Sequence, residues 1–283
     1  MSTDYQQARE ALGARLRELR TKADLNGKEF AERLGWQRSK VSRLETGKQT
    51  AAPADLEAWT RAAGKPEAGQ ELMRSLSGLQ RLETAHRSWK RQLAAGHRAV
   101  QEGHAVQEAQ AETIHIFESG VIPGIFQTPD YARGVLTDVS NRLGTARDIE
   151  EGVRARMKRQ EAVYEPGHHF HVLVWEAALH VVRCAPAAMA AQLNRLSGFI
   201  GLDTVTLGII PLGTRTPFSP KHGFWIIDER LVVADTWNAE LWLDAADDVA
   251  YYRKLWNLME ASAVFDHHAH RVIARARAGL TLS

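Results

Sequence analysis

The sequence predicts an α+β fold: an all-α N-terminal domain, a long linker helix, and a mixed α/β C-terminal domain with a small sheet. Three observations predict it. Apolar residues recur at helical spacing through the first third of the chain, strand-like alternation begins near residue 112, and the charge balance changes sign between these regions. A chain of 283 residues is long enough for two cores, so we expect domains at 1–66 and 105–283, joined by a linker at 67–104.

The first domain is organised around two short helices that cross through a tight turn, within residues 27–44. Ala31 is small enough to let the second helix approach the first, and Gly35 can end the first helix in a left-handed conformation. Val41 and Leu44, three residues apart, are expected to face inward from the second helix. The pattern predicts a helix-turn-helix. The donors left exposed on its second helix are Arg38, Ser39, Ser42 and Arg43.

This region resembles the Xre-type regulators, the group that includes the phage repressors, and the resemblance spans roughly residues 8–65. The segment Glu45-Thr46-Gly47-Lys48 resembles the loop that follows the second helix in that family. A lambda-repressor-like fold and sequence-specific binding to double-stranded DNA are therefore implied. Gly27 departs from the pattern, because many relatives carry Gln there for a phosphate contact. Lys28 or a backbone amide could replace that contact.

The second helix and its flanks supply the DNA contacts that we expect. Arg38 and Arg43 suit the O6 and N7 atoms of guanine, and Ser39 can exchange a hydrogen bond with a base edge. The remaining polar side chains are expected to hold phosphates and set the register. The full predicted set is Gln37, Arg38, Ser39, Lys40, Ser42, Arg43, Lys48 and Lys28.

The charge distribution fits a DNA-contacting module attached to a domain that does not touch DNA. Residues 1–100 hold 19 Lys and Arg against 12 Asp and Glu, whereas residues 101–283 hold 17 against 22. There is one cysteine, Cys184, and neither a signal-peptide pattern nor an apolar run of membrane-spanning length. We therefore expect a cytoplasmic protein without a membrane segment.

Two long helical patterns flank this segment. The first covers residues 6–22, and its Arg15 and Arg20 could reach phosphates or simply be solvated. The second runs from Glu67 to about Ala95, which at about 1.5 Å per residue gives a helix of roughly 43 Å. This helix could serve as a spacer, as a packing element for the second domain, or as half of a dimer interface. Packing is favoured over a coiled coil because the heptad repeat of apolar residues is imperfect.

The second domain begins with a strand at residues 112–119 and the segment Ile122-Pro123-Gly124-Ile125-Phe126-Gln127-Thr128-Pro129-Asp130-Tyr131-Ala132. This segment resembles the hallmark of the WhiJ-like group of actinobacterial Xre-type regulators. The resemblance implies a small acidic partner protein encoded by a neighbouring gene. Structurally, the segment is expected to pack the linker helix onto the domain. The alternative places Gln127, Thr128 and Tyr131 in a ligand pocket or on a partner-binding face.

The rest of the domain reads as a β-α-β-β-β-α array. A basic helix at 148–164 carries Arg154, Arg156, Lys158 and Arg159, which we expect to be surface charge, with a second DNA contact as the alternative. Further strands are expected at 170–176, 204–210, 223–228 and 231–236, the last two joined by a tight turn. A closing helix is expected over 247–275, with a break near Asp266.

Catalytic motifs are missing from the sequence, so we do not expect an enzyme. Two histidine clusters, His168–His171 and His267–His270, could together form a zinc or nickel site if they met. Histidines in such clusters more commonly face solvent or cap a helix or strand. We therefore expect neither a metal nor a cofactor.

Three functions remain to be separated. The favoured one is a homodimeric transcriptional regulator that takes a signal through its C-terminal domain. An alternative is an antitoxin-like autoregulator whose C-terminal domain grips a small partner protein. The third is an enzyme that carries a DNA-binding module, which would require a site with perturbed acids or ligated histidines.

Overall fold

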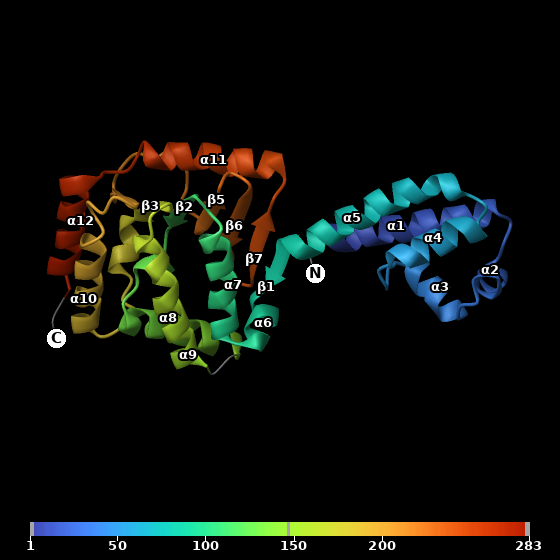
Figure 1. Ribbon diagram of the computed structural model, residues 1–283, viewed down its shortest axis with the longest axis horizontal. Helices are drawn as coiled ribbons and strands as arrows, with labels where there is room; N and C mark the ends of the chain where they lie inside the picture. The colour runs from blue at the N-terminus through green and yellow to red at the C-terminus, as the bar shows by residue number, and fades with distance from the viewer. Residues whose placement is uncertain (1–2, 146–147, 281–283) are drawn as a thin grey trace. The chain divides into compact units, whose positions relative to one another are not determined.

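The computed structural model describes the backbone of residues 3–145 and 148–280, with side chains placed at 6–79, 87–145 and 148–280. The chain divides into two compact units, residues 1–86 and 87–283, each with its own core. The fold is α+β, as predicted, with a helix-turn-helix domain at the N-terminus (Figure 1).

The first unit is built from five helices within the described residues: α1 (Thr3–Lys22), α2 (Gly27–Leu34), α3 (Arg38–Glu45), α4 (Pro53–Ala62) and α5 (Gly69–Ala85). Trp59 is fully buried at the centre, with the Phe30 ring centroid 4.8 Å from its own. Its indole Nε1 donates a hydrogen bond of 3.0 Å to the carbonyl oxygen of Leu16, so the largest side chain of this core has no unpaired polar atom. Burying this ring fixes α4 against α1.

The expected helix from Glu67 to Ala95 is interrupted. A 3-10 turn (Pro66–Ala68) precedes α5, which ends at Ala85; strand β1 (His86–Ser88), helix α6 (Trp89–Gln92) and a second 3-10 turn (Leu93–Ala95) follow. The backbone N–H of Trp89 donates to the carbonyl of Asn238 at 3.0 Å, and its indole Nε1 donates to the carbonyl of Thr236, also at 3.0 Å. These hydrogen bonds to the loop between β6 and β7 fix the chain where the long helix is interrupted. Along α5, Leu72, Leu76 and Leu79 belong to the first core instead of a separate linker.

The second unit is organised around a mixed sheet with the strand order β1-β7-β6-β5-β2-β3-β4. Its remaining strands are β2 (Thr113–Glu118), β3 (His169–Trp175), β4 (Val205–Ile210), β5 (Phe224–Ile227), β6 (Leu231–Asp235) and β7 (Ala239–Leu243). The strands β2, β3 and β4 are parallel, whereas β5, β6 and β7 pair in antiparallel fashion. Asp228 and Glu229 both have positive φ, the geometry of the predicted tight turn between β5 and β6. The sequence predicted β2 to β6 and missed β1 and β7.

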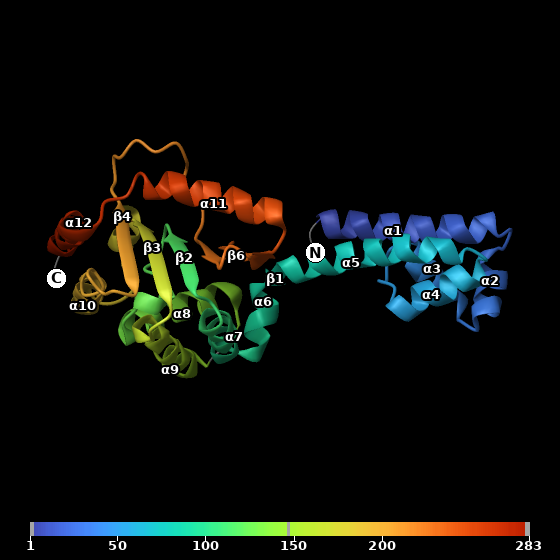
Figure 2. The same cartoon turned by 45° about the horizontal axis from the view of Figure 1, so that its top comes forward.

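Helices cover both faces of this sheet (Figures 1 and 2). Helix α11 (Ala246–Glu260) lies along one face, where Trp256 packs against buried residues of β2, β5 and β6. The opposite side carries α7 (His97–Ala109), α8 (Pro129–Leu143) and α9 (Ile149–Arg159), while α10 (Pro186–Ser197) and α12 (Asp266–Ala278) lie side by side near β4. The closing helix is broken close to the predicted place, because Val264 between α11 and α12 pairs with Ile209 of β4.

Candidate nucleic-acid interface

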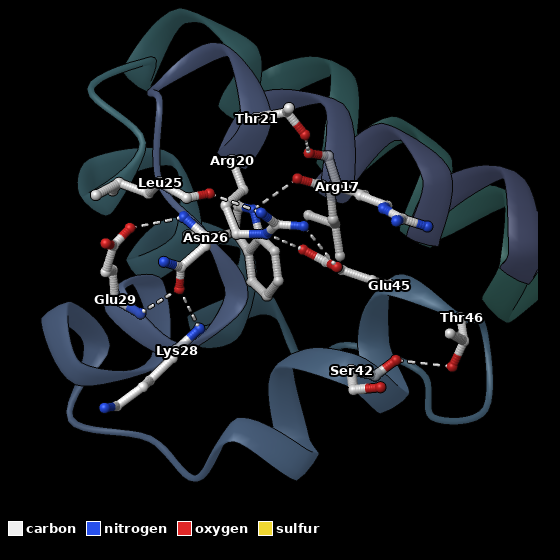
Figure 3. Close-up of polar contacts among 12 residues, drawn as sticks. Arg17, Arg20, Thr21, Leu25, Asn26, Lys28, Glu29, Ser42, Glu45 and Thr46 are labelled. Atoms are coloured by element: carbon white, nitrogen blue, oxygen red, sulfur yellow. Dashed lines mark hydrogen bonds and ion pairs between the residues drawn. The ribbon is translucent and has the colours of Figure 1, made fainter.

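The turn between α2 and α3 is fixed by caps at both ends of α2. Asn26 Oδ1 accepts hydrogen bonds from the backbone N–H groups of Lys28 and Glu29, and Glu29 Oε2 accepts from the Asn26 N–H (Figure 3). At the other end, Gly35 has φ +67, and the Trp36 N–H donates to the Ala31 carbonyl at 2.8 Å. The chain therefore leaves α2 in one direction and enters α3 within a few residues.

Helix α3 is anchored by its apolar face and exposes its polar one. Val41 and Leu44 are 1% and 2% exposed and lie in the first core. On the other side Arg38 and Arg43 are exposed, and Arg43 Nε donates to Gln49 Oε1 at 3.0 Å. This arrangement leaves a row of hydrogen-bond donors and acceptors facing solvent from a helix of eight residues. The predicted residues that are exposed in this row are Gln37, Arg38, Ser39, Ser42 and Arg43.

Three lysines were predicted to contact DNA, and the structure places them differently. Lys28 and Lys48 are exposed; Lys28 Nζ lies 4.0 Å from Glu32 Oε1 on the surface of α2. Lys40 is half-buried. Its Nζ is 2.6 Å from Asp55 Oδ1 and 3.8 Å from the centre of the Trp36 ring, so its charge already has partners inside the domain. Lys40 therefore ties α3 to the start of α4.

A buried ion pair joins α1 to the end of α3. Arg20 Nε and Nη2 donate to the two carboxylate oxygens of Glu45 at 2.6 and 3.1 Å, and Arg20 Nη1 donates to the Leu25 carbonyl (Figure 3). Both charged side chains are only 10% exposed. The suggestion that Arg15 and Arg20 reach phosphates is wrong for Arg20, which is buried. Arg15 is paired at the surface with Glu18 and Glu71.

Gly13 also positions α3, and the sequence analysis missed it. A Cβ atom added at Gly13 would lie 2.6 Å from the Leu44 carbonyl oxygen and 2.7 Å from that of Glu45. Only glycine allows α1 to cross the C-terminal end of α3 this closely. A glycine inside an otherwise regular helical pattern was the available signal.

In the second unit, the three residues proposed for a ligand or partner face have internal hydrogen bonds. The Tyr131 hydroxyl accepts from the Ile122 N–H, and Thr128 Oγ1 accepts from the Tyr131 N–H as the N-cap of α8. Gln127 is 1% exposed, and its Nε2 donates to the Ile122 carbonyl at 2.7 Å. These contacts make Thr128 and Tyr131 part of the framework of the second unit. The apolar residues of the segment lie in that unit's own core, to which no described residue of 67–104 contributes, so the expected packing of the linker helix onto the segment is not found. The side-chain Oε1 of Gln127 accepts a hydrogen bond from Arg156 Nη1 at the wall of a cavity.

The basic helix of the second unit is not a uniform surface. Arg154 and Lys158 are exposed, but Arg156 and Arg159 are turned inward. Arg159 is 6% exposed, and its Nε lies 2.9 Å from Glu108 Oε2 of α7. The expectation of surface charge is therefore wrong for these two arginines. Their partners lie between 29 and 58 positions earlier in the chain, which local sequence does not reveal.

The histidine clusters do not assemble a metal site in the described part of the chain, where no three His, Cys, Asp or Glu side chains gather closely enough to hold an ion. His169 and His171 do share a side of β3, with ring centroids 4.5 Å apart, and His115 of β2 stacks on His171 at 4.8 Å. His267, His268 and His270 are exposed on α12. No helix among the described residues is long and apolar enough to cross a membrane.

Comparison with known proteins adds two matches. Residues 101–275 match a family described as a domain of unknown function (DUF5753), and residues 11–73 match a helix-turn-helix domain. No curated protein matches the chain. The solved structure of TrmBL2, an archaeal chromatin protein with a novel mode of DNA binding, is 14% identical over 86% of this chain and 88% of that one. Its TM-score is 0.32, at which the likeness does not establish a shared fold.

Proposed function

The chain belongs to the family of the domain of unknown function DUF5753, preceded here by a helix-turn-helix domain, and from this premise we propose that it is a transcriptional regulator that reads an operator in double-stranded DNA with α3. The observation that carries the proposal is the exposure of Arg38, Ser39 and Arg43 together on a short helix whose other face is anchored in the core. A helix of this size fits the major groove of B-DNA, where base edges present a distinct pattern for each base pair.

The exposed residues fall into two groups by the contact we assign to them. Arg38 and Arg43 read guanine, and Ser39 and Gln37 exchange hydrogen bonds with neighbouring base edges. Ser42, Lys48 and Lys28 bind phosphates and set the register of α3 in the groove. Lys40 keeps its contact with Asp55 and supports α3 from behind, so we do not assign it a phosphate.

We further propose that the protein acts as a homodimer. Two copies of α3 would then enter successive major grooves about 34 Å apart, and the operator would be an inverted repeat. Selection of binding duplexes from a random pool tests this directly, with light scattering of the free protein for its mass. A single half-site in the selected sequences, together with a monomeric mass, would contradict the dimer.

Two substitutions separate base reading from phosphate binding. Arg38→Ala removes a bidentate contact, so we expect preference for guanine at one operator position to fall by about 1–3 kcal/mol while affinity for other sequences changes little. Lys48→Ala should weaken binding to all duplexes about equally and reduce the slope of log K against log salt by about 1. Fluorescence anisotropy over a salt series measures both. Equal effects of the two substitutions on specificity would refute the assignment.

The finer family placement and the partner belong to the proposal as well. We place the chain with the WhiJ-like Xre-type regulators, on the segment 122–132. The alternative function, an antitoxin-like autoregulator that holds a small acidic protein, is favoured by exposed aromatic side chains on the second unit, with Trp237 81% and Tyr251 60% exposed. Co-purification with the product of the neighbouring gene tests it. An interaction lost in Trp237→Ser or Tyr251→Ser would support that alternative.

A further inference from the structure

A cavity of about 510 Å³ lies within the second unit, at the carboxyl end of β2. Its walls come from α7, α8, α9 and the ends of β5 and β6, so segments far apart in the sequence build it. The volume is that of a site for a small organic molecule. Ligands of open sheets with parallel strands commonly bind outside the carboxyl ends of those strands.

Two carboxyl groups line one side of this cavity. Glu118 is the last residue of β2 and Asp235 the last residue of β6, on either side of β5. Gly223, just before β5, makes room between them: a Cβ there would lie 2.5 Å from Glu118 Oε2, and the Gly223 carbonyl accepts a 3.0 Å hydrogen bond from the Asp235 N–H. Neither carboxylate is in direct contact with a cationic side chain of the described residues, and Glu118 has a hydrogen bond with the Trp225 side chain.

The acidic pair is poorly solvated. Burial and, to a smaller extent, the nearby Glu240 charge together raise the pKa of Asp235 to about 7, although the charges of Arg156 and Arg159 act in the opposite direction. Burial also raises the pKa of Glu118 well above its ordinary range, with a contribution from the Asp235 charge. Two neighbouring carboxyl groups in such a setting are stabilised by a proton or by a positive group placed between them.

A guanidinium group faces the same cavity. Arg156 Nε donates to Gln101 Oε1 at 3.1 Å, and its Nη1 donates to Gln127 Oε1 at 2.6 Å. Both partners are neutral, and no carboxylate of the described residues forms an ion pair with Arg156. Burial lowers the pKa of this guanidinium to about 9. The two amides hold the group in place without a direct ion pair, and the charges of Asp235 and Glu118 act on it from the same cavity.

Other charged side chains close to Arg156 are in direct contact with groups of opposite charge, and Arg156 differs from them in this respect. Arg159 pairs with Glu108, and His104 Nε2 lies 2.8 Å from Glu240 Oε1. Arg159 and His104 also line the cavity, but each is in direct contact with a carboxylate, whereas Arg156 forms no direct ion pair with a described residue. Trp89, Trp225 and Trp237 also line the cavity and offer aromatic surface for the body of a ligand.

We propose that this cavity binds a small zwitterionic molecule of the amino-acid type. Its ammonium group would lie between Glu118 and Asp235, its carboxylate would meet Arg156, and its apolar part would pack against the tryptophan side chains. A simple cation would leave Arg156 unpaired, and a simple anion would leave both carboxyl groups unpaired. A divalent metal is disfavoured because no group of three His, Cys, Asp or Glu side chains occurs among the described residues. The proposal extends the regulatory part of the proposed function by naming the class of signal.

The first test is binding to the full-length protein, without DNA in the assay. Each of the twenty free amino acids is added at millimolar concentration and thermal unfolding is recorded. We expect at least one to raise the melting temperature of the second unit by several degrees. The best binder is then compared by calorimetry with its decarboxylated amine and its deaminated acid, and both should bind at least tenfold more weakly. If no amino acid raises the melting temperature, or if either single-charge analogue binds as tightly as the zwitterion, the proposal is overturned.

The second test uses isosteric variants. Asp235→Asn and Glu118→Gln remove a buried charge without changing volume, so they should leave the melting temperature of the ligand-free protein unchanged or higher while removing the ligand-induced shift. Arg156→Met should also remove the shift, and Arg154→Met, on the exposed face of the same helix, is its control. A ligand-induced shift that survives in both Asp235→Asn and Arg156→Met would contradict the proposed contacts. Because the assay contains no DNA, a negative result in these binding tests would not contradict operator binding. Likewise, an absence of operator binding would not contradict a positive result in these tests.

Discussion

At the residue scale, small and polar side chains decide how α3 is presented. Gly35 with its left-handed φ and the Asn26 capping box were readable from the sequence, because each depends only on residues a few positions away. Gly13 and Arg20 were not, since their roles depend on contacts with Leu44 and Glu45 across about 25 to 31 positions. The position of Lys40 on the second helix predicts a phosphate contact, but its partner Asp55 lies on the next helix and is not apparent from the local pattern.

Gly27 gives a prediction at this scale. It is the first residue of α2, and a Cβ added there meets nothing within 4 Å. Gly27→Gln should restore a phosphate contact, strengthening DNA binding by about 0.5–1.5 kcal/mol. Because glutamine is neutral, the salt slope should not change. Gly69→Gln, at the start of α5 and equally open, is the matched control in an anisotropy titration. Equal affinities for Gly27→Gln and the wild type would exclude this contact.

At the scale of elements, the Arg20–Glu45 pair couples α1 to α3. Removing one partner of a buried ion pair leaves an uncompensated charge, so Glu45→Gln should lower the free energy of unfolding of the first unit by roughly 2–4 kcal/mol. Glu18→Gln, which changes an exposed carboxylate, should cost much less than Glu45→Gln. Calorimetry of the full chain measures both. A loss for Glu45→Gln no larger than for Glu18→Gln would show that the pair does not hold α3.

The elements of the second unit were predictable to different degrees. The strands β2 to β6 and the break in the closing helix follow from alternation and turn residues, which are local signals. The edge strands β1 and β7 are short, and β1 interrupts a sequence with a helical pattern, so pairing with the sheet overrides local preference. The inward turn of Arg156 and Arg159 depends on Gln101 and Glu108 of α7, and no charge pattern on α9 reveals it.

The pH dependence of stability belongs to the scale of the second unit. Because the folded state holds the pKa of Asp235 at about 7 against an ordinary 3.8, the ionised carboxylate costs stability above pH 7. That cost disappears as the pH falls toward 4, because the folded state then binds a proton that the unfolded state does not. Asp235→Asn should therefore exceed the wild type in free energy of unfolding by roughly 1–3 kcal/mol at pH 8, and the difference should shrink as the pH falls below 7 and become small near pH 4.

Urea unfolding of both proteins at several pH values measures this difference. The buried histidines His97, His115 and His171 have lowered pKa values, chiefly through burial, and they destabilise the unit on acidification in the opposite sense. They are present in both proteins and cancel in the comparison. A difference that stays constant between pH 5 and pH 8 would mean that Asp235 titrates normally.

At the scale of the whole molecule, the sequence predicted a helix-turn-helix domain followed by an α+β domain, and both are found. It did not predict the cavity, because the cavity is defined by the meeting of β2, β6, α7 and α9, which only the tertiary fold brings together. The central claim is that α3 reads DNA.

One measurement tests that claim most directly: the affinity of the full chain for its selected operator and for a scrambled duplex. In the variant that combines Arg38→Ala, Ser39→Ala and Arg43→Ala, we expect the preference for the operator to fall to nearly one. The control combines Arg17→Ala, Arg74→Ala and Ser77→Ala, which removes the same side-chain types from exposed positions of α1 and α5, and it should keep the preference. Operator preference that persists in the first variant would contradict the claim.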